Sequence, residues 1–153
     1  MRVYLDTSLL VAALIREPGT DTAKRFLQTA EGQDWLLSAW TEVELSSALS
    51  IKCRSGVITA VESAQALQRY GVLRDARCTL VALEAQDFST AHGFCSNPTP
   101  AIRAGDALHL AVCQRQRSTL ASFDQELCDA AEHYRIAMER LKIPGQRPSR
   151  SSS

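Results

Sequence analysis

Four acidic residues stand where apolar segments of this chain begin or end, and their residue type and placement could do chemistry. Asp6 closes the run VYLD, Glu44 lies in SAWTEVELSSAL, Asp106 lies in GDALHLA and Asp124 closes TLASFD. Carboxylates repel one another, so a cluster persists only where a cation or a proton compensates their charge. A hard divalent cation takes several oxygen ligands from separate segments. If these four acids converge, they predict a metal centre.

Helix capping is the competing explanation for each acid. Aspartate near a helix start accepts hydrogen bonds from unpaired backbone amides, which suits Asp6, Asp106 and Asp124. Glu44 stands three residues after Thr41, which is the spacing of a capping box. Capping explains any one of these residues by itself, whereas a shared cation explains all four together.

The other residue types narrow the choice of metal and of compartment. The five cysteines form no CxxC pair, which argues against a zinc site and against a disulfide framework. Mg²⁺ or Mn²⁺ suits an all-oxygen site, where it polarises a phosphoryl oxygen and lowers the pKa of a bound water. Those effects are the ones needed to hydrolyse a phosphodiester. A chain without a disulfide framework is expected in a reducing cytoplasm.

Length and composition indicate one ordinary globular domain. The chain has 153 residues, of which 45% are hydrophobic and 22% are charged, and its formal net charge is zero. Zero net charge removes the simplest argument for a nucleic-acid binder, a strongly basic surface. No run approaches the roughly 20 apolar residues that span a bilayer, so no membrane partner is expected. We expect a domain over residues 1–144 and a disordered polar tail over 145–153.

Apolar runs alternate with helical patterns along the chain, and these elements must position the acids. Strands are predicted over residues 3–5, 35–40, 78–83 and 119–123, with 135–138 as a fifth candidate that could instead continue the preceding helix. Helices are predicted over 9–15 and 21–30, from Thr41, from Thr59 to near Gly71, around Phe88 and Ala91, over 106–117, and through Leu127 and Ala131.

This alternation predicts a three-layer α/β/α sandwich around a central parallel sheet of four to five strands. Such sheets bind ligands beyond the carboxyl ends of their strands, where the strand order reverses. Asp6 and Asp124 would face that crevice if their strands are neighbours. Glu44 and Asp106 would project toward it from the beginnings of helices.

Four segments resemble the motifs of PIN domains, and they occur in the same order. VYLDTSLLVAAL is similar to the opening strand and helix, SAWTEVELSSAL to the second-acid segment, IRAGDALHLAVC to the central helix, and LASFDQEL to the fourth-acid segment. The resemblance extends from residue 1 to about residue 144. The short form with a DALHLA helix is most similar to the VapC toxins of bacterial toxin–antitoxin pairs.

The resemblance implies an endoribonuclease toxin that hydrolyses RNA with a metal-activated water and is neutralised by a VapB-type antitoxin. Its metal-binding and catalytic acids would be Asp6, Glu44, Asp106 and Asp124, with Mg²⁺ or Mn²⁺ as cofactor. Glu44 is preferred to the nearby Glu42 because it directly precedes Leu45, as the family pattern requires. Such toxins self-associate, so we expect a homodimer, for which the helix from Thr59 to Tyr70 is one candidate surface.

Five further residues lie beside these motifs. Ser8 and Ser122 match hydroxyl positions of the family, where they would orient a carboxylate or a water, and capping explains each of them equally well. His109 is expected to pack or to contact an acid rather than to act as a base, because hydrolysis here needs only a metal-bound water. Arg103 could hold a substrate phosphate or face solvent, and Asp129 is expected to be a solvated helix residue.

Three other functions compete with this one. A haloacid-dehalogenase-like phosphatase also uses an acid after its first strand, but it needs an aspartate two residues further on, where this chain has Ser8. The other two are a PIN nuclease of RNA processing with no toxic role and a non-catalytic α/β interaction module. The sequence identifies neither the RNA nor the position of the cut.

Overall fold

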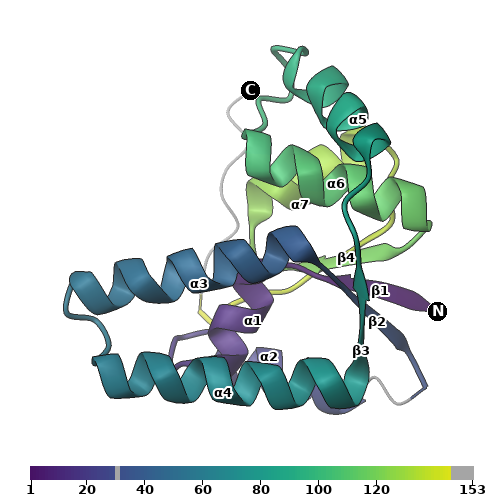
Figure 1. Ribbon diagram of the computed structural model, residues 1–153. Helices are drawn as coiled ribbons and strands as arrows, with labels where there is room; N and C mark the ends of the chain where they lie inside the picture. The colour runs from purple at the N-terminus through teal and green to yellow at the C-terminus, as the bar shows by residue number, and fades with distance from the viewer. Residues whose placement is uncertain (30–31, 146–153) are drawn as a thin grey trace.

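The computed structural model describes residues 1–29 and 32–145, and it contains a five-stranded sheet with helices on both faces (Figure 1). The elements in chain order are β1 (Arg2–Leu5), α1 (Thr7–Leu14), α2 (Thr20–Thr29), β2 (Asp34–Ser38), α3 (Ala39–Arg54), α4 (Ala60–Arg77), β3 (Cys78–Val81), α5 (Ala85–Cys95), α6 (Ala104–Gln116), β4 (Thr119–Ser122), α7 (Gln125–His133) and β5 (Met138–Arg140). All neighbouring strands are parallel, in the order β3-β2-β1-β4-β5. The predicted three-layer α/β/α sandwich is confirmed.

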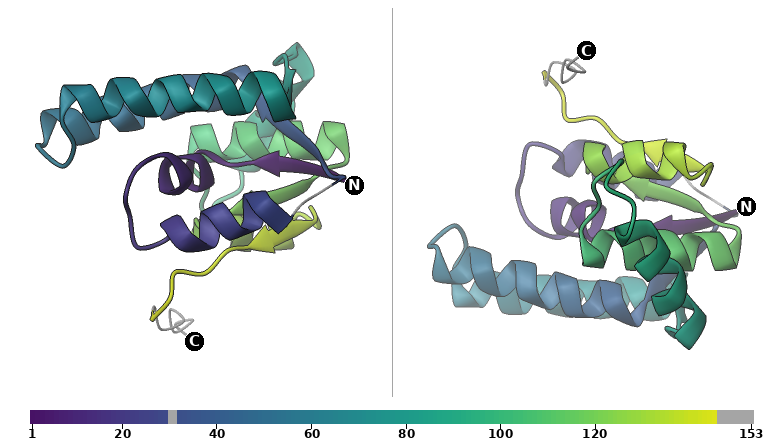
Figure 2. Two further views of the ribbon diagram at one scale, coloured as in Figure 1. Left: turned by 90° about the horizontal axis from the view of Figure 1, so that it is seen from below. Right: turned by 90° about the horizontal axis from the view of Figure 1, so that it is seen from above.

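Successive side chains of the strands build a core on each face of the sheet. Val3 and Leu5 of β1 pack with residues of α1, α2, α3 and α4. Tyr4, between them, packs on the opposite face with α5, α6 and α7. The two views of Figure 2 place α6 and α7 on one side of the sheet and α1 and α2 on the other. A strand buried on both faces needs apolar residues throughout, which is why β1 has no alternating pattern.

The beginning of α3 differs from the predicted capping box of Thr41 and Glu44. Ser38 is the N-cap, its hydroxyl accepts from the backbone N–H of Thr41 at 3.2 Å, and Thr41 is the third helical residue. The second strand therefore ends at Ser38 instead of Trp40, because the chain already turns into the helix at Ala39. This correction leaves Glu44 without a capping role.

Two other predicted boundaries are wrong. The α4 helix does not end near Gly71 but continues to Arg77, whose guanidinium lies 4.5 Å from the ring centre of Trp35. The fifth strand begins at Met138 rather than at Arg135, because Arg135 has φ 57° and turns the chain after α7. The capping box of Thr59 and Glu62 that opens α4 is confirmed.

Some of the predicted segments extend beyond the residues that the structure describes. Ala30, the last residue of the predicted second helix, and residues 146–153 of the predicted tail are outside the described ranges. Within those ranges, no helix combines the length and the apolar character needed to cross a bilayer.

Candidate metal centre

The site lies at the carboxyl edge of the sheet, where the strand order reverses. The strands β1 and β4 are parallel neighbours, with Leu5 opposite Ala121, and the backbone N–H of Asp6 donates to the carbonyl of Ala121 at 3.1 Å. The strand β2, which leads into α3, lies on the other side of β1. This is the position where open parallel sheets bind ligands. The segments bearing Asp6 and Asp124 are therefore neighbours, as the crevice hypothesis requires.

Asp6 is held by two hydroxyl groups, one from the first turn of α1 and one from the end of β4. Its carboxylate is buried, and its Oδ2 accepts from Ser8 Oγ at 2.6 Å and from Ser122 Oγ at 2.7 Å. It is also the N-cap of α1, since Oδ2 accepts from the backbone N–H of Ser8 at 3.2 Å. The other oxygen, Oδ1, lies 3.7 Å from Nε2 of His109. Capping and cluster membership thus coexist at Asp6, because different oxygens serve the two roles.

Glu44 points from α3 toward Asp6. Its Oε2 accepts from Thr7 Oγ1 at 2.8 Å and lies 2.5 Å from His109 Nε2. Burial raises the pKa of Glu44, but the hydrogen bond and charge of His109 and the hydroxyl of Thr7 together lower it below its usual value. The carboxylate is therefore held in its charged form.

Glu42 points away from this group. Its carboxylate accepts from Tyr70 Oη at 3.0 Å and pairs with Arg74 at 3.0 Å, both on α4. Side chains two positions apart on a helix point about 200° away from each other, so Glu42 and Glu44 cannot face the same neighbour. The geometry favours Glu44 as the acid of α3 that faces Asp6.

Asp106 lies in the first turn of α6 and shares an electrostatic neighbourhood with the other three acids. Burial raises its pKa from 3.8 to about 6, and the negative charges of Asp124, Asp6 and Glu44 contribute to the rise. The N-cap of α6 is Arg103, so Asp106 has no capping role. The four predicted acids therefore interact electrostatically. The negative charges of the other three acids oppose the ionisation of Asp106.

Asp124 is the outermost of the four acids. It is exposed and is the N-cap of α7, where its carboxylate accepts from the backbone N–H of Leu127 at 3.0 Å. Its own backbone N–H donates to Ser122 Oγ at 2.9 Å, and the same hydroxyl bonds to Asp6. Ser122 thus fixes the position of both strand-end acids.

His109 lies between the acids and the sheet. The residue is 0% exposed, and its ring contacts Glu44 and faces Asp6. Single ligand atoms of Asp6, Glu44 and His109 all lie within 4.8 Å of one another, and Asp106 and Asp124 are not members of this tight group. Burial lowers the pKa of His109, but the hydrogen bond to Glu44 and the charges of Asp6, Glu44 and Asp106 raise it above its usual value.

Two residues of the site were missed in the sequence. Thr7 donates to Glu44, and Gly105 leaves room for the same carboxylate. A Cβ atom at position 105 would lie 2.8 Å from Glu44 Oε1 and 3.2 Å from Cζ2 of Trp40. Glycine weakens a helix by about 0.5–1 kcal/mol relative to alanine, so a glycine in the first turn beside an acid was a usable signal.

The other two candidate residues, Arg103 and Asp129, lie at the edge of the acidic cluster or away from it. Arg103 is exposed and lines a hollow of about 180 Å³ together with Asp106 and Glu126. Asp129 is on the surface of α7 and pairs with Arg140 at 2.7 Å. Asp129 is therefore a surface residue, as expected, and lies apart from the cluster.

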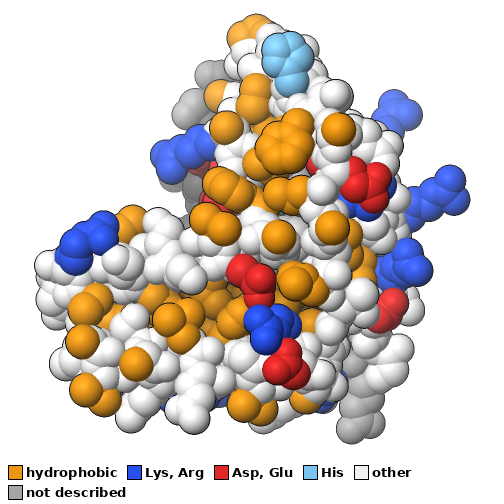
Figure 3. All heavy atoms as spheres, in the orientation of Figure 1, with side chains coloured by type: hydrophobic (Ala, Val, Ile, Leu, Met, Phe, Trp, Pro, Cys, Tyr) orange, Lys and Arg blue, Asp and Glu red, His pale blue; other side chains and the backbone are white. Residues whose placement is uncertain are grey.

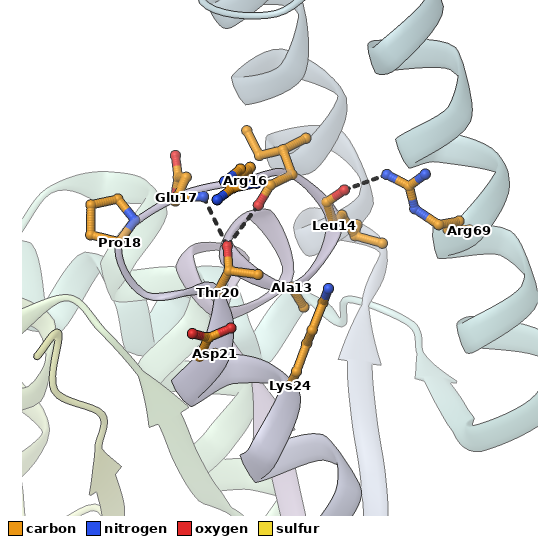
Figure 4. Close-up of a pocket in the computed structure, with 10 residues that line it drawn as sticks. Ala13, Leu14, Arg16, Glu17, Pro18, Thr20, Asp21, Lys24 and Arg69 are labelled. Carbon is orange, nitrogen blue, oxygen red and sulfur yellow. Dashed lines mark hydrogen bonds between the residues drawn. The ribbon is translucent and has the colours of Figure 1, made fainter.

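A larger hollow of about 770 Å³ lies where α1 ends and α2 begins (Figure 4). Its polar groups close this turn: Thr20 Oγ1 donates to the carbonyl of Ile15 at 3.0 Å, and Arg69 donates to the carbonyl of Leu14. The α1 helix begins beside Asp6 and has eight residues, so its two ends are about 12 Å apart. This hollow is separate from the acids.

A family model described as the PIN domain matches residues 3–133, and the chain therefore belongs to the PIN-domain family. Among curated relatives, it is 31% identical over 149 residues to Ribonuclease VapC35 of Mycobacterium tuberculosis, covering 94% of this chain and 98% of that protein. The sequence resemblance to the VapC ribonucleases is thus confirmed.

Solved structures share the fold at low sequence identity. VapC20 of Mycobacterium tuberculosis, a toxin that cleaves the sarcin–ricin loop, matches with a TM-score of 0.69 and 18% identity over 84% of this chain and 94% of its own. VapBC2 of Rickettsia felis, bound to a DNA fragment from its promoter, matches with a TM-score of 0.68 and 16% identity over 93% of this chain and 100% of that chain. These likenesses show the fold alone.

Proposed function

We propose that this chain is a metal-dependent endoribonuclease toxin of the VapC kind. The observation that carries the proposal is the convergence of acids from separate segments: Asp6 after β1 and Glu44 on α3 both face the ring of His109. The charges of these acids and of Asp124 also help burial to raise the pKa of Asp106. Such a group is suited to a divalent cation, which supplies the positive charge that crowded carboxylates need. Relatives named ribonucleases make RNA the substrate class.

Asp6, Glu44, Asp106 and Asp124 would hold Mg²⁺ or Mn²⁺. When bound, the cation would polarise a phosphoryl oxygen of RNA and lower the pKa of a water. The protein contributes the orientation of its carboxylates: Ser8 and Ser122 fix Asp6, and Thr7 and His109 fix Glu44. An all-oxygen set fits these cations better than zinc.

Arg103 is proposed to contact a phosphate of the RNA. It lines the hollow beside Asp106, and a cation there offsets the repulsion between the acids and the nucleic-acid backbone. A phosphate contact of this kind strengthens binding without specifying sequence. Arg103→Ala should therefore raise KM more than it lowers kcat, measured on a short RNA substrate.

The test of the function compares Asp6→Asn with Asp129→Asn. Asp6→Asn keeps the shape of the side chain but removes the negative charge, and RNA cleavage should fall by about 100-fold or more, with loss of growth inhibition. Asp129→Asn, on the surface of α7, should keep both activities. Circular dichroism checks that both variants fold. If Asp6→Asn cleaves RNA as the parent does, the metal-nuclease proposal is wrong.

A VapB-type antitoxin is the proposed protein partner. Structural relatives include VapBC2 of Rickettsia felis and FitAB, which were solved with DNA fragments. A cationic side chain of the antitoxin would neutralise the acids and thereby block access of RNA. Co-expression of the protein encoded beside this chain should restore growth. Continued growth arrest despite a stable complex would argue against neutralisation.

Self-association through α4 and residence in the cytoplasm complete the proposal. The Val61 and Leu67 side chains of α4 are exposed, at 66% and 40%. Figure 3 shows apolar side chains gathered along the hairpin of α3 and α4. Burying such side chains in a dimer is favourable.

The five free cysteines are compatible with a reducing cytoplasm.

A further inference from the structure

A buried hydroxyl network supports the acids from beneath. The Tyr4 side chain is 0% exposed, and its Oη lies 2.6 Å from Ser38 Oγ, 2.9 Å from Thr41 Oγ1 and 2.7 Å from Nδ1 of His109. A phenol has one proton to donate and two lone pairs to accept with, so these three partners use its full capacity. Burial raises the pKa of Tyr4 well above its usual value, which keeps that proton in place.

The proton positions of His109 follow from its two neighbours. Nε2 faces carboxylate oxygens of Glu44 and Asp6, which can only accept while they are ionised, so Nε2 must carry a proton. Nδ1 accepts from Tyr4 when the ring is neutral and donates to it when the ring is charged. In both forms Nε2 donates to Glu44, and only the neutral tautomer with its proton on Nδ1 is excluded.

The network joins the three elements that carry three of the four acids. Tyr4 is on β1, two residues before Asp6. Ser38 and Thr41 lie at the start of α3, the helix that carries Glu44. His109 is on α6, three residues after Asp106. The ring of His109 is fully buried and hydrogen-bonded on both sides, so its direction is fixed by the core. Glu44, in contrast, is partly exposed and reaches the site on a long flexible side chain.

We propose that His109, held by Tyr4, is the positioning residue that aims the Glu44 carboxylate at the metal. The inference rests on the proposed metal site. While Nε2 donates its proton to Glu44, it has no lone pair left to bind a cation, so His109 acts through Glu44. His109 Nε2 and Glu44 Oε2 are 2.5 Å apart, which is a hydrogen bond. Partners of this kind change metal affinity by about 10–100-fold when removed.

The experiment titrates Mn²⁺ into the full chain and follows the free ion by electron paramagnetic resonance. The variants are His109→Gln, whose amide nitrogen can reach the place of Nε2, and His109→Asn, whose shorter side chain reaches only the place of Nδ1. His109→Asn should weaken Mn²⁺ binding by about 10-fold or more, and His109→Gln should stay within about threefold of the parent. If His109→Asn does not fold, Tyr4→Phe takes its place, because it removes only the hydroxyl that sets the ring.

The spectrum of the bound ion separates positioning from ligation. Electron spin-echo modulation of the Mn²⁺ complex should show no directly coordinated nitrogen, and such a nitrogen would overturn the inference. Parent-like affinity in folded His109→Asn would overturn it as well. If the parent binds no Mn²⁺, or if Asp6→Asn binds it equally well, the proposed metal site itself fails and the inference fails with it.

Discussion

The raised pKa of Asp106 predicts that the substitution Asp106→Asn stabilises the metal-free protein at neutral pH. The carboxyl has a pKa of about 6 in the folded chain, against 3.8 as its usual value. The folded state therefore binds a proton more tightly than the unfolded state does. The stability from this group is fully present below pH 3.8 and is lost as the pH rises through about 6.

The size of the effect follows from the shift. Two pKa units correspond to about 3 kcal/mol, which solvent screening of a partly exposed carboxyl reduces to about 1–2 kcal/mol. The aspartate also gains up to about 1 kcal/mol from its place in the first turn of a helix, which asparagine loses. We therefore expect Asp106→Asn to raise the free energy of unfolding at pH 7 by about 1 kcal/mol, or Tm by about 2–4 °C.

Urea unfolding of both proteins in a chelator, at pH 7 and at pH 3.5, measures this difference. The gain of Asp106→Asn should be present at pH 7 and nearly absent at pH 3.5, where the parent carboxyl is protonated in the folded state and mostly protonated in the unfolded state. Added Mn²⁺ should stabilise the parent more than the variant, because a ligand that binds only the folded state raises its stability. A variant that is less stable than the parent at pH 7, or whose gain persists at pH 3.5, would refute the reasoning.

Three further predictions concern residues around the site and on the surface. Gly105→Ala should weaken Mn²⁺ binding, measured by calorimetry, by about 10-fold, because the added methyl group displaces the Glu44 carboxylate. The Tm of this variant should change by only a few degrees. An unchanged affinity would show that Glu44 is not a ligand. Asp87→Ala should lower the free energy of unfolding by about 3–5 kcal/mol in urea, because it leaves the Arg115 guanidinium without its buried partner; a loss below about 1 kcal/mol would contradict this. Leu67→Glu should shift the chain from dimer to monomer in sedimentation at low micromolar concentration, and a persistent dimer would place the interface elsewhere.

The sequence was sufficient for the parts of the fold that depend on local pattern. The strand ends at Asp6 and Asp124 could be located because a short apolar run followed by a helical pattern fixes both elements. The start of α3 could not, because Ser38 and Thr41 both fit an N-cap and only the packing of Tyr4 against their hydroxyls chooses between them. A glycine at position 71 favours a helix end by sequence, yet α4 continues through it to Arg77, which lies over Trp35.

The site depended on contacts between distant segments, which a single sequence does not contain. Glu42 and Glu44 are the same residue type two positions apart, so the sequence does not distinguish them by chemistry. Their partners do: Glu42 contacts Tyr70 and Arg74 of α4. Glu44 contacts His109 of α6. The supporting contacts come from residues 37 and 65 positions away from Glu44. The resemblance to PIN domains pointed to the acids, but the residues that hold them became visible only in the fold.

The most direct test of the central claim is a crystal structure of the protein soaked in Mn²⁺, with the ion located by its anomalous scattering. The proposed four-acid metal centre predicts a peak between β1, α3, α6 and α7, with oxygens of Asp6, Glu44, Asp106 or Asp124 about 2.0–2.4 Å from the ion. A crystal with Mn²⁺ only at other surface acids, and none among these four, would contradict the account.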